Sequence, residues 1–488
     1  MVAGAGRVRR WRAHGSRRRP DPAVGVSRAG AEKRPRSAPP RDRSGASPAR
    51  RCALRVVSRV STDGAYADRA LRAEADRLRL EGRERALAEA LAFGAVQRRA
   101  TLDHVIQACS DRPLSALDPP LLDTLRLGVL QLLSLGSVPD RAAVDQSVEL
   151  AREAVGRGAA GFANAVLRRA AREGRALVAR LADDTPEEAA ILHSHPEWIV
   201  RLWWGELGPG DTRSLLRHDN EPPELALRAN ELVATRGEVL AALRRSGVAA
   251  GAAVDLPEGV VVDGRLDLGR SPLFAAGAIT PQSRASMLVA RVVGPRPGER
   301  VLDLCAAPGA KTTHLAALMR RQGTLVAVER NPRRARALAG NCRRLHADLA
   351  EVVAADARDA EIGEAYDRVL LDPPCSDLGT LAARPDARWR KSPEQVAELA
   401  GLGAELLRAA AGRVRPGGVL VLSTCTICAR ENSEQVARFL AEQPDFRADD
   451  LGREWPALAD RADPRCLQTL PHRDATSGFF VARLRRTG

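Results

Sequence analysis

Short apolar runs alternate with helix-length segments from about residue 280 to the end of the chain. Strands buried between helices read as continuous apolar stretches, and the runs lie at 301–304, 325–328, 352–355, 369–371 and 419–422. This alternation is typical of a mostly parallel sheet that is covered by helices on both faces. The sequence therefore predicts an α/β doubly wound, Rossmann-like domain over residues 276–488.

The residues before this domain follow two other patterns. Apolar residues recur at helical spacing between 66 and 170, for example at Leu121, Leu125 and Val129, which predicts an all-α domain over 61–180. Residues 181–275 mix helical stretches with a strand-like alternation at 225–230, which predicts a small α/β adaptor. The protein is therefore expected to be multidomain.

Composition separates the first 60 residues from the rest. The chain has 488 residues and a formal net charge of +15, of which +14 lies in residues 1–60, a stretch rich in Arg, Pro, Gly and Ser. Such a segment cannot bury enough apolar surface to fold, so 1–60 is predicted to be a disordered tail. It is either a basic arm for RNA phosphates or a dispensable extension. The remaining residues are almost neutral, so charge alone does not predict nucleic-acid binding.

The cysteines and the hydropathy exclude two further classes of protein. Eight Cys are scattered along the chain, unlike the dense disulfide framework of a small secreted domain. No apolar run approaches the roughly 20 residues that span a bilayer, and the N-terminus lacks the apolar core of a secretory signal. We therefore expect a cytoplasmic protein with reduced thiols and no membrane partner.

Acidic and small residues follow the predicted strands where ligands bind in doubly wound folds. The first strand leads into a small-residue turn at 303–312, which lets backbone N–H groups approach a ligand at a helix N-terminus. Glu329 ends the second strand 20 residues after Gly309, a separation typical of a carboxylate that binds ribose hydroxyls. Asp356 follows the third strand, near the expected adenine edge. The sequence thus predicts an adenosine-containing cofactor.

Two cysteines follow the next two strands. Cys375 belongs to Asp372-Pro373-Pro374-Cys375-Ser376, and Cys425 belongs to Ser423-Thr424-Cys425-Thr426. One such Cys would usually be a small packing residue, but two on adjacent loops at one edge of the sheet indicate thiolate chemistry.

Several separate motifs together resemble the RsmB/NOP (Sun) family of S-adenosylmethionine-dependent RNA 5-methylcytosine methyltransferases. The helical domain, with Phe162 and Asn164 in its last helix, is similar to the NusB-like RNA-binding domain of the RsmB branch. The motifs, in order, are 303–312, Asp372-Pro373-Pro374-Cys375-Ser376, Arg384-Pro385-Asp386 with Trp389, Thr424-Cys425-Thr426, Glu431-Asn432 and 478–483.

The resemblance implies methyl transfer to carbon 5 of a cytosine in RNA, most simply small-subunit rRNA. It assigns Cys425 as the nucleophile that adds to carbon 6, Cys375 to the release step, and Asp372 to the ring edge near N3. The cofactor is S-adenosyl-L-methionine, expected at Cys305, Ala306, Ala307, Pro308, Gly309, Ala310, Lys311, Glu329, Asp356 and Asp372.

Alternatives stay open at this point. The same chemistry on tRNA or another rRNA site is one, and a non-catalytic RNA-binding or ribosome-assembly factor is another. DNA enzymes of this chemistry use the Pro-Cys of the fourth-strand loop as nucleophile, so the second thiol at Cys425 favours RNA over DNA. A monomer is expected. Cys425 and Cys428 form a C-x-x-C, but it supplies only two of the four ligands of a structural zinc site, so no metal is expected.

The sequence departs from the family pattern at a few positions. Ala310 replaces a Gly in the cofactor turn, which is tolerable if its φ is negative. Thr426 replaces a Ser and keeps the hydroxyl group. Acidic residues are lacking at 282–283 and 477–478. None of these changes removes a proposed catalytic group.

Overall fold

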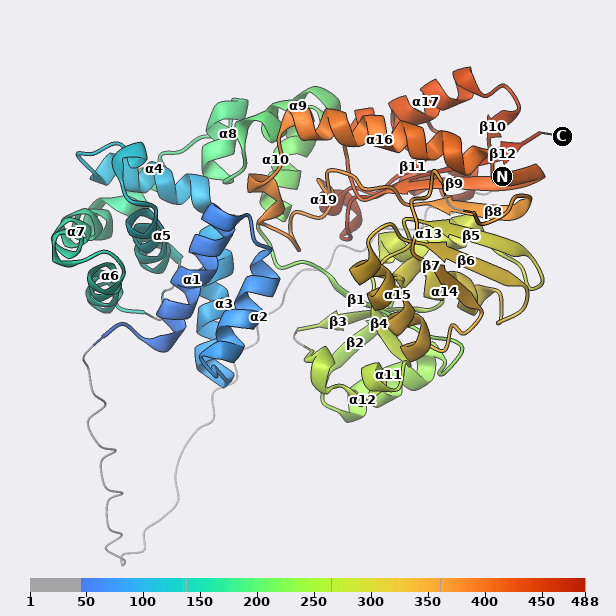
Figure 1. Cartoon of the computed structure of the whole chain (residues 1–488). Helices are drawn as coiled ribbons and strands as arrows, with labels where there is room; N and C mark the ends of the chain where they lie inside the picture. Colours follow the sequence, from blue (N-terminus) through green and yellow to red (C-terminus); the bar gives the residue numbers. More distant parts are fainter. Residues whose placement is uncertain (1–44, 135, 137, 265, 360, 488) are drawn as a thin grey trace, which may run out of the picture. The chain divides into compact units, whose positions relative to one another are not determined.

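Figure 1 shows the computed structural model of the chain, which describes residues 45–487 apart from 135, 137, 265 and 360. Most of the predicted tail, residues 1–44, lies outside the described residues. Within the described part, no helix is long and apolar enough to cross a membrane.

Helices α1 to α7 form the predicted all-α domain. Their apolar faces meet in one core, and every residue from 125 to 132 of the central helix α5 is buried. Phe162 packs against this core from α7, and Asn164 lies beside it half-buried. The helices are α1 (Pro48–Asp63), α2 (Ala67–Arg77), α3 (Gly82–Gln97), α4 (Arg99–Cys109), α5 (Pro119–Ser134), α6 (Asp140–Ala154) and α7 (Arg157–Ala179).

Helix α1 corrects the predicted boundary of the tail at residue 60. Its apolar residues Cys52, Ala53, Val56, Val57 and Val60 recur at helical spacing and are buried against the other helices. Arg residues interrupt this apolar period and made the segment resemble a basic tail. In the structure, their side chains make defined contacts with the other helices. For example, the Nε atom of Arg50 donates to the Oε1 atom of Gln131 at 2.8 Å. The prediction of disorder is therefore wrong for 48–60.

The adaptor has a helical part and a sheet part. Helices α8 (Pro186–Leu192), α9 (Glu197–Leu207) and α10 (Pro209–His218) pack together against loops of the C-terminal domain, including Leu378 and Ile427. A four-stranded antiparallel sheet in the order β2-β3-β1-β4 follows, with α11 (Arg236–Arg245) against it. Its strands are β1 (Leu225–Ala229), β2 (Ala249–Ala252), β3 (Gly259–Asp263) and β4 (Ile279–Pro281).

Strand β4 lies beyond the predicted end of the adaptor at residue 275. It pairs with β1 through residues 279–281, so the adaptor sheet is completed by residues that the sequence assigned to the next domain. A three-residue strand gives too short a pattern to be recognised in sequence.

The C-terminal domain is the predicted doubly wound sheet, in the order β10-β12-β9-β8-β5-β6-β7, with β11 beside β12. The five apolar runs form its parallel strands. Helices α13 (Arg284–Val293), α14 (Ala310–Leu318) and α15 (Pro332–Arg344) cover one face, and α16 (Pro393–Ala411) and α17 (Ser433–Glu442) cover the other (Figure 1). The strands are β5 (Arg300–Leu304), β6 (Thr324–Val328), β7 (Ala350–Val353), β8 (Tyr366–Leu371), β9 (Val414–Thr424), β10 (Phe446–Ala448), β11 (Leu467–Gln468) and β12 (Phe480–Arg486).

The register of the sheet aligns the ends of four strands. Leu304 pairs with Val328 and with Leu371, which in turn pairs with Leu422. The strand order reverses at β5, because the chain passes from β5 through β6 to β7 and then returns to β8 on the other side of β5. Ligands in doubly wound folds bind at such a switch point.

Candidate active site

The turn after β5 is shaped by two residues with left-handed backbone conformations. Cys305 has φ of 64° and Gly309 has φ of 103°. A Cβ atom at Gly309 would lie 2.6 Å from the Cδ1 atom of Leu338, so this position needs glycine for space as well as for conformation. Ala310 is the first residue of α14, where φ is negative, and its extra methyl group is therefore tolerated.

A cavity of about 350 Å³ opens beside this turn, a volume within the range of small-molecule sites. Three of the residues predicted to bind the cofactor line this cavity, namely Cys305, Glu329 and Asp356. The full lining is Cys305, Val328, Glu329, Arg330, Asn331, Pro332, Arg334, Ala355, Asp356, Ala357, Pro374, Leu402 and Leu406.

The two carboxylates of the cavity differ in their surroundings. Glu329 is buried and accepts a hydrogen bond from the backbone N–H of Asn331 at 2.9 Å. Asp356 accepts from the Nε and Nη2 atoms of Arg358 at 3.0 and 2.9 Å, and this pairing lowers its pKa to about 2. A buried acceptor in a cavity that Pro374, Leu402 and Leu406 also line fits an adenosine group whose ribose hydroxyls donate hydrogen bonds.

Lys311 lies beside Asp372, toward the strand β9 side of the site. Its Nζ atom donates to the Oδ2 atom of Asp372 at 2.6 Å, and the Oγ atom of Ser423 donates to Oδ1 at 2.9 Å. Burial disfavours the ammonium form, but the Asp372 charge outweighs it and raises the pKa of Lys311. These two hydrogen bonds fix the orientation of the Asp372 carboxylate, where the sequence predicted a role at the target base.

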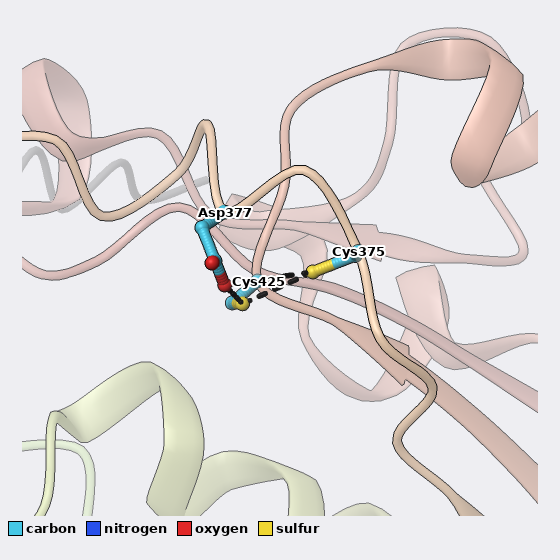
Figure 2. Close-up of side chains that lie close together, drawn as sticks. All are labelled: Cys375, Asp377 and Cys425. Atoms are coloured by element: carbon cyan, nitrogen blue, oxygen red, sulfur yellow. Dashed lines mark hydrogen bonds between the residues drawn. The ribbon is translucent and has the colours of Figure 1, made fainter. Parts of the chain in front are cut away.

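The two predicted thiols meet across the loops that follow β8 and β9. The Sγ atoms of Cys375 and Cys425 lie 3.1 Å apart. Figure 2 shows the two cysteines together with Asp377, which approaches Cys425 from the other side. The Cys425 thiol donates to the Oδ1 atom of Asp377 at 2.9 Å, whereas Cys375 lies 4.0 Å from the same oxygen. Hydrogen bonding to Cys375, together with burial, raises the pKa of Cys425 well above its ordinary value.

A buried hydrogen-bond network behind the thiols holds the two loops together. Ser376 and Thr426, the residues directly after the two cysteines, join through their hydroxyl oxygens at 2.7 Å. Glu431 accepts from the backbone N–H of Ser376 at 2.8 Å and also accepts from its hydroxyl group. The amide nitrogen of Asn432 donates to the carbonyl of Thr426 at 3.0 Å. The hydroxyl group that Thr426 retains therefore forms a hydrogen bond that joins the two loops.

Backbone contacts add a second connection between the loops. Gly379 donates to the carbonyl of Cys425 at 3.0 Å, and its own carbonyl accepts from Gly478 at 2.7 Å. A Cβ atom at Gly379 would lie 1.9 Å from the Gly478 carbonyl oxygen. The separation of the two sulfur atoms therefore depends on a close approach of backbones.

The other cysteines lack this arrangement. Burial raises the pKa of Cys305 and of Cys428 to about 12, which disfavours their thiolates. In the described residues, Cys375, Asp377 and Cys425 form a group of three whose ligand atoms lie within 4.8 Å of one another, and Cys428 is not part of it.

Asp377 is the residue of the site that the sequence analysis missed. It stands two positions after Cys375, but its φ of 61° is left-handed, and sequence alone does not reveal that this turn aims its carboxylate at Cys425. The sequence offered one indication, because Asp adopts the left-handed conformation more readily than most residues and this Asp lies two positions after Cys375.

The loop after Cys375 also contacts the helical domain. The indole N–H of Trp389 donates to the carbonyl of Val96 in α3 at 2.7 Å. Arg388 is fully buried and donates to the carbonyl oxygens of Ser194 and Asp219 at 3.0 Å each. The motif residue Trp389 therefore joins the loop that follows Cys375 to the helical domain.

Comparison with known protein families gives the same order of domains. Residues 290–485 match the 16S rRNA methyltransferase RsmB/F model. Residues 47–172 match the NusB family, and residues 195–269 match the ferredoxin-like domain of RsmF/B-like methyltransferases. The NusB match begins at residue 47, in agreement with the position of α1.

Relatives align with nearly the whole chain. A Mycobacterium tuberculosis protein named as a methyltransferase is 40% identical over 465 residues, which cover 93% of this chain and 99% of the relative. The ribosomal RNA small subunit methyltransferase B of Pseudomonas putida is 32% identical and covers 89% and 98%. The crystal structure of PH0851 is 27% identical, with a TM-score of 0.77, over 90% of this chain and 98% of that chain.

A further solved structure shares the fold of the catalytic part. NSun6 from Pyrococcus horikoshii, solved with SFG, is 22% identical with a TM-score of 0.57, over 61% of this chain and all of that one. The family model and the relatives together define an S-adenosylmethionine-dependent methyltransferase that acts on RNA. The chain belongs to the RsmB/F family of 16S rRNA methyltransferases, as the motifs predicted.

Proposed function

We propose that this protein methylates carbon 5 of a cytosine in small-subunit rRNA through a covalent adduct with Cys425. The observation that carries the proposal is the pair of thiols, 3.1 Å apart, at the ends of neighbouring strands and one residue from the cofactor cavity at Pro374. Two thiols in contact are needed when one must add to the base and the other must assist its release. The match to the NusB and RsmB/F models supports rRNA as the target.

Cys425 performs the first step. Carbon 5 of cytosine is a weak nucleophile, and a thiolate that bonds to carbon 6 moves electron density onto carbon 5. Bound S-adenosylmethionine supplies the electrophilic methyl group. Cys375, in its thiolate form, then removes the carbon-5 proton, and the bond between Sγ of Cys425 and carbon 6 breaks to restore the ring.

Asp372 and Lys311 stabilise the base during these steps. Their ion pair fixes the carboxylate, and Ser423 occupies its other oxygen from the protein side. A fixed carboxylate can accept a hydrogen bond from the exocyclic amino group or the protonated N3 as charge develops, without reorganisation. The target cytosine must leave any base stack to reach them, which costs a few kcal/mol and favours loop or single-stranded RNA.

The test uses labelled S-adenosylmethionine and deproteinised small-subunit rRNA. Wild type is compared with Cys425→Ala and Cys375→Ala, 5-methylcytosine is identified by nucleoside mass spectrometry, and covalent protein–RNA adducts are resolved on a denaturing gel. We expect that Cys425→Ala loses both transfer and adduct, whereas Cys375→Ala accumulates a stable adduct. Cys342→Ala, which changes a buried cysteine of helix α15, serves as the matched control and is expected to stay active.

The outcomes separate the alternatives. Transfer by Cys425→Ala with an adduct at Cys375 would exchange the two roles. Methylation of tRNA but not rRNA would keep the chemistry and change the target. If the wild-type protein bound RNA but transferred no methyl group, it would be an RNA-binding or assembly factor, and the proposal would be overturned.

A further inference from the structure

Asp377 is in direct contact with the sulfur atom that the proposed function makes the nucleophile. Its Oδ1 atom lies 2.9 Å from Sγ of Cys425 and 4.0 Å from Sγ of Cys375. In the described part of the chain, these thiols are the groups that its carboxylate contacts, and Figure 2 shows the carboxylate pointing at Cys425. The residue is half-buried.

The position of this carboxylate is fixed by its own turn. The carbonyl of Asp377 accepts from the N–H and the Oγ atom of Thr380, at 3.0 and 2.9 Å. The left-handed φ of 61° turns the side chain toward the β9 loop, across from Cys375. Residue 377 is therefore anchored at both its backbone and its side chain.

The surroundings of Cys425 do not by themselves produce a thiolate. Its charged and titratable neighbours in the described part of the chain include Cys375, Asp377, Asp372 and Lys311. Lys311 is paired with Asp372, and Lys391 donates to the backbone carbonyl of Cys375 at 3.3 Å. Cys375 and the two carboxylates all raise the pKa of the Cys425 thiol, with Cys375 and burial as the larger causes. The Cys425 thiol already donates to the Asp377 carboxylate at 2.9 Å, so the proton that must leave when the sulfur adds to carbon 6 has an acceptor in place.

We propose that Asp377 is the catalytic base that takes the proton of the Cys425 thiol as its sulfur adds to carbon 6. This inference rests on the proposed function, because it requires Cys425 to be the nucleophile. It adds a proton acceptor whose position neither the family match nor the motifs assign.

The protons balance over one turnover. The S–H bond of Cys425 breaks, its proton moves to the Asp377 carboxylate, and the sulfur electron pair forms the bond to carbon 6. After methyl transfer, the carbon-5 proton passes to the Cys375 thiolate and the bond between Sγ and carbon 6 breaks. The proton on Asp377 returns to the departing Cys425, and Cys375 loses its proton to solvent, which is the single proton that the net reaction releases.

The experiment measures two reactions of Cys425 in Asp377→Asn and Asp377→Gly, both of which suit a left-handed position. Alkylation by iodoacetamide without RNA or cofactor, followed by peptide mass spectrometry between pH 6 and 10, reports the thiolate population. Adduct formation with rRNA and S-adenosylmethionine, in a Cys375→Ala background, reports the catalysed step. Asp348→Asn, a surface carboxylate of the same domain, is the matched control and is expected to behave as wild type.

We expect the two reactions to move in opposite directions. Loss of the negative charge at 377 lowers the pKa of the thiol, so alkylation near pH 7 should be several-fold faster. Loss of the base should slow adduct formation roughly 100-fold or more near pH 7. As pH rises toward the thiol pKa, the variants should recover about tenfold per pH unit, because hydroxide then supplies the thiolate.

Other outcomes overturn the inference. Adduct formation by both variants at the wild-type rate across the pH range would remove Asp377 from the proton transfer. Slower alkylation together with slower adduct formation would indicate a structural role, as would a fall in Tm that is absent from the control. Failure of the parent enzyme to produce 5-methylcytosine would instead contradict the proposed function, so the two failures are distinguishable.

Discussion

The Sγ atoms of Cys375 and Cys425 lie 3.1 Å apart, against about 2.05 Å in a disulfide bond. Both loops are held in place by the network at Ser376 and Thr426, so the two sulfur atoms stay close together. We therefore expect diamide to oxidise the pair to a disulfide, with diamide reduced to its hydrazine, and to abolish methyl transfer until dithiothreitol is added. Peptide mass spectrometry without reduction should detect the cross-link.

The control for this prediction is Cys375→Ala, which should gain no cross-link under the same treatment. Bound rRNA and cofactor should protect the wild-type pair, because the target base would separate the sulfur atoms. Inactivation without a Cys375–Cys425 cross-link would contradict the prediction.

Thiophilic metal ions should inhibit the enzyme. Cys375, Asp377 and Cys425 present three ligand atoms within 4.8 Å, a set that Zn²⁺ prefers once the thiols are deprotonated. Occupation would remove both thiols from chemistry, so added Zn²⁺ should abolish methyl transfer, more strongly at higher pH. EDTA should restore activity, and EDTA alone should leave the activity of the purified enzyme unchanged. Loss of activity with EDTA would instead indicate a required metal.

The contact between Trp389 and Val96 should contribute to domain association. Trp389→Phe keeps an aromatic ring under Arg99 but removes the N–H that donates at 2.7 Å, leaving the Val96 carbonyl without this donor. An unsatisfied buried acceptor costs about 1–3 kcal/mol. We expect faster proteolysis between α7 and α8 and a lower Tm, with intact secondary structure by circular dichroism. Trp455→Phe, remote from this contact, is the comparison variant, and equal proteolysis of the two would contradict the prediction.

The sequence predicted the elements whose patterns are local. Five apolar runs became β5 to β9, and residues at the strand ends, such as Cys375 and Cys425, met because parallel strands end at one edge of the sheet. Helix α1 was missed because its buried period is interrupted by Arg residues that pair with distant groups, as Arg51 does with Glu153.

The remaining features depend on contacts between residues far apart in the chain. The ion pair between Lys311 and Asp372 joins residues 61 positions apart, and Arg388 is buried although its residue type is usually exposed. The role of Asp377 follows from one backbone angle. Tertiary packing determines where a side chain points and whether a charged group is buried. The spacing of residues along the sequence does not predict either property.

Gly379→Ala should disrupt the thiol pair. Its Cβ atom would lie 1.9 Å from the Gly478 carbonyl oxygen, so the β8 loop must move away from Cys425. We expect a loss of stability of about 1–3 kcal/mol and a fall in adduct formation of roughly 100-fold. Gly401→Ala is the matched control, because nothing lies within 4 Å of its Cβ and α16 should gain up to about 1 kcal/mol. Full adduct formation by Gly379→Ala would show that the contact is dispensable.

Asp303 should make the protein less stable as pH rises. Burial raises its pKa to about 7, with the Asp372 charge acting in the same direction and the hydrogen bond from Thr312 opposing it. An unfolded Asp titrates near 3.9, so the protonated carboxyl stabilises the fold fully below about pH 4, and this contribution is lost as pH rises through about 7. Asp303→Asn remains neutral and should lose this dependence.

The expected result is a Tm difference between Asp303→Asn and wild type that increases in favour of the variant from pH 5 to pH 8. The shift of about three pKa units sets an upper limit of about 4 kcal/mol on the effect. Circular dichroism melts at each pH measure it, with Asp348→Asn as the surface control whose Tm should follow wild type. Parallel curves for Asp303→Asn and wild type would mean that Asp303 is ionised in the folded protein at neutral pH, so that its charge is balanced by Lys311 across the cofactor turn.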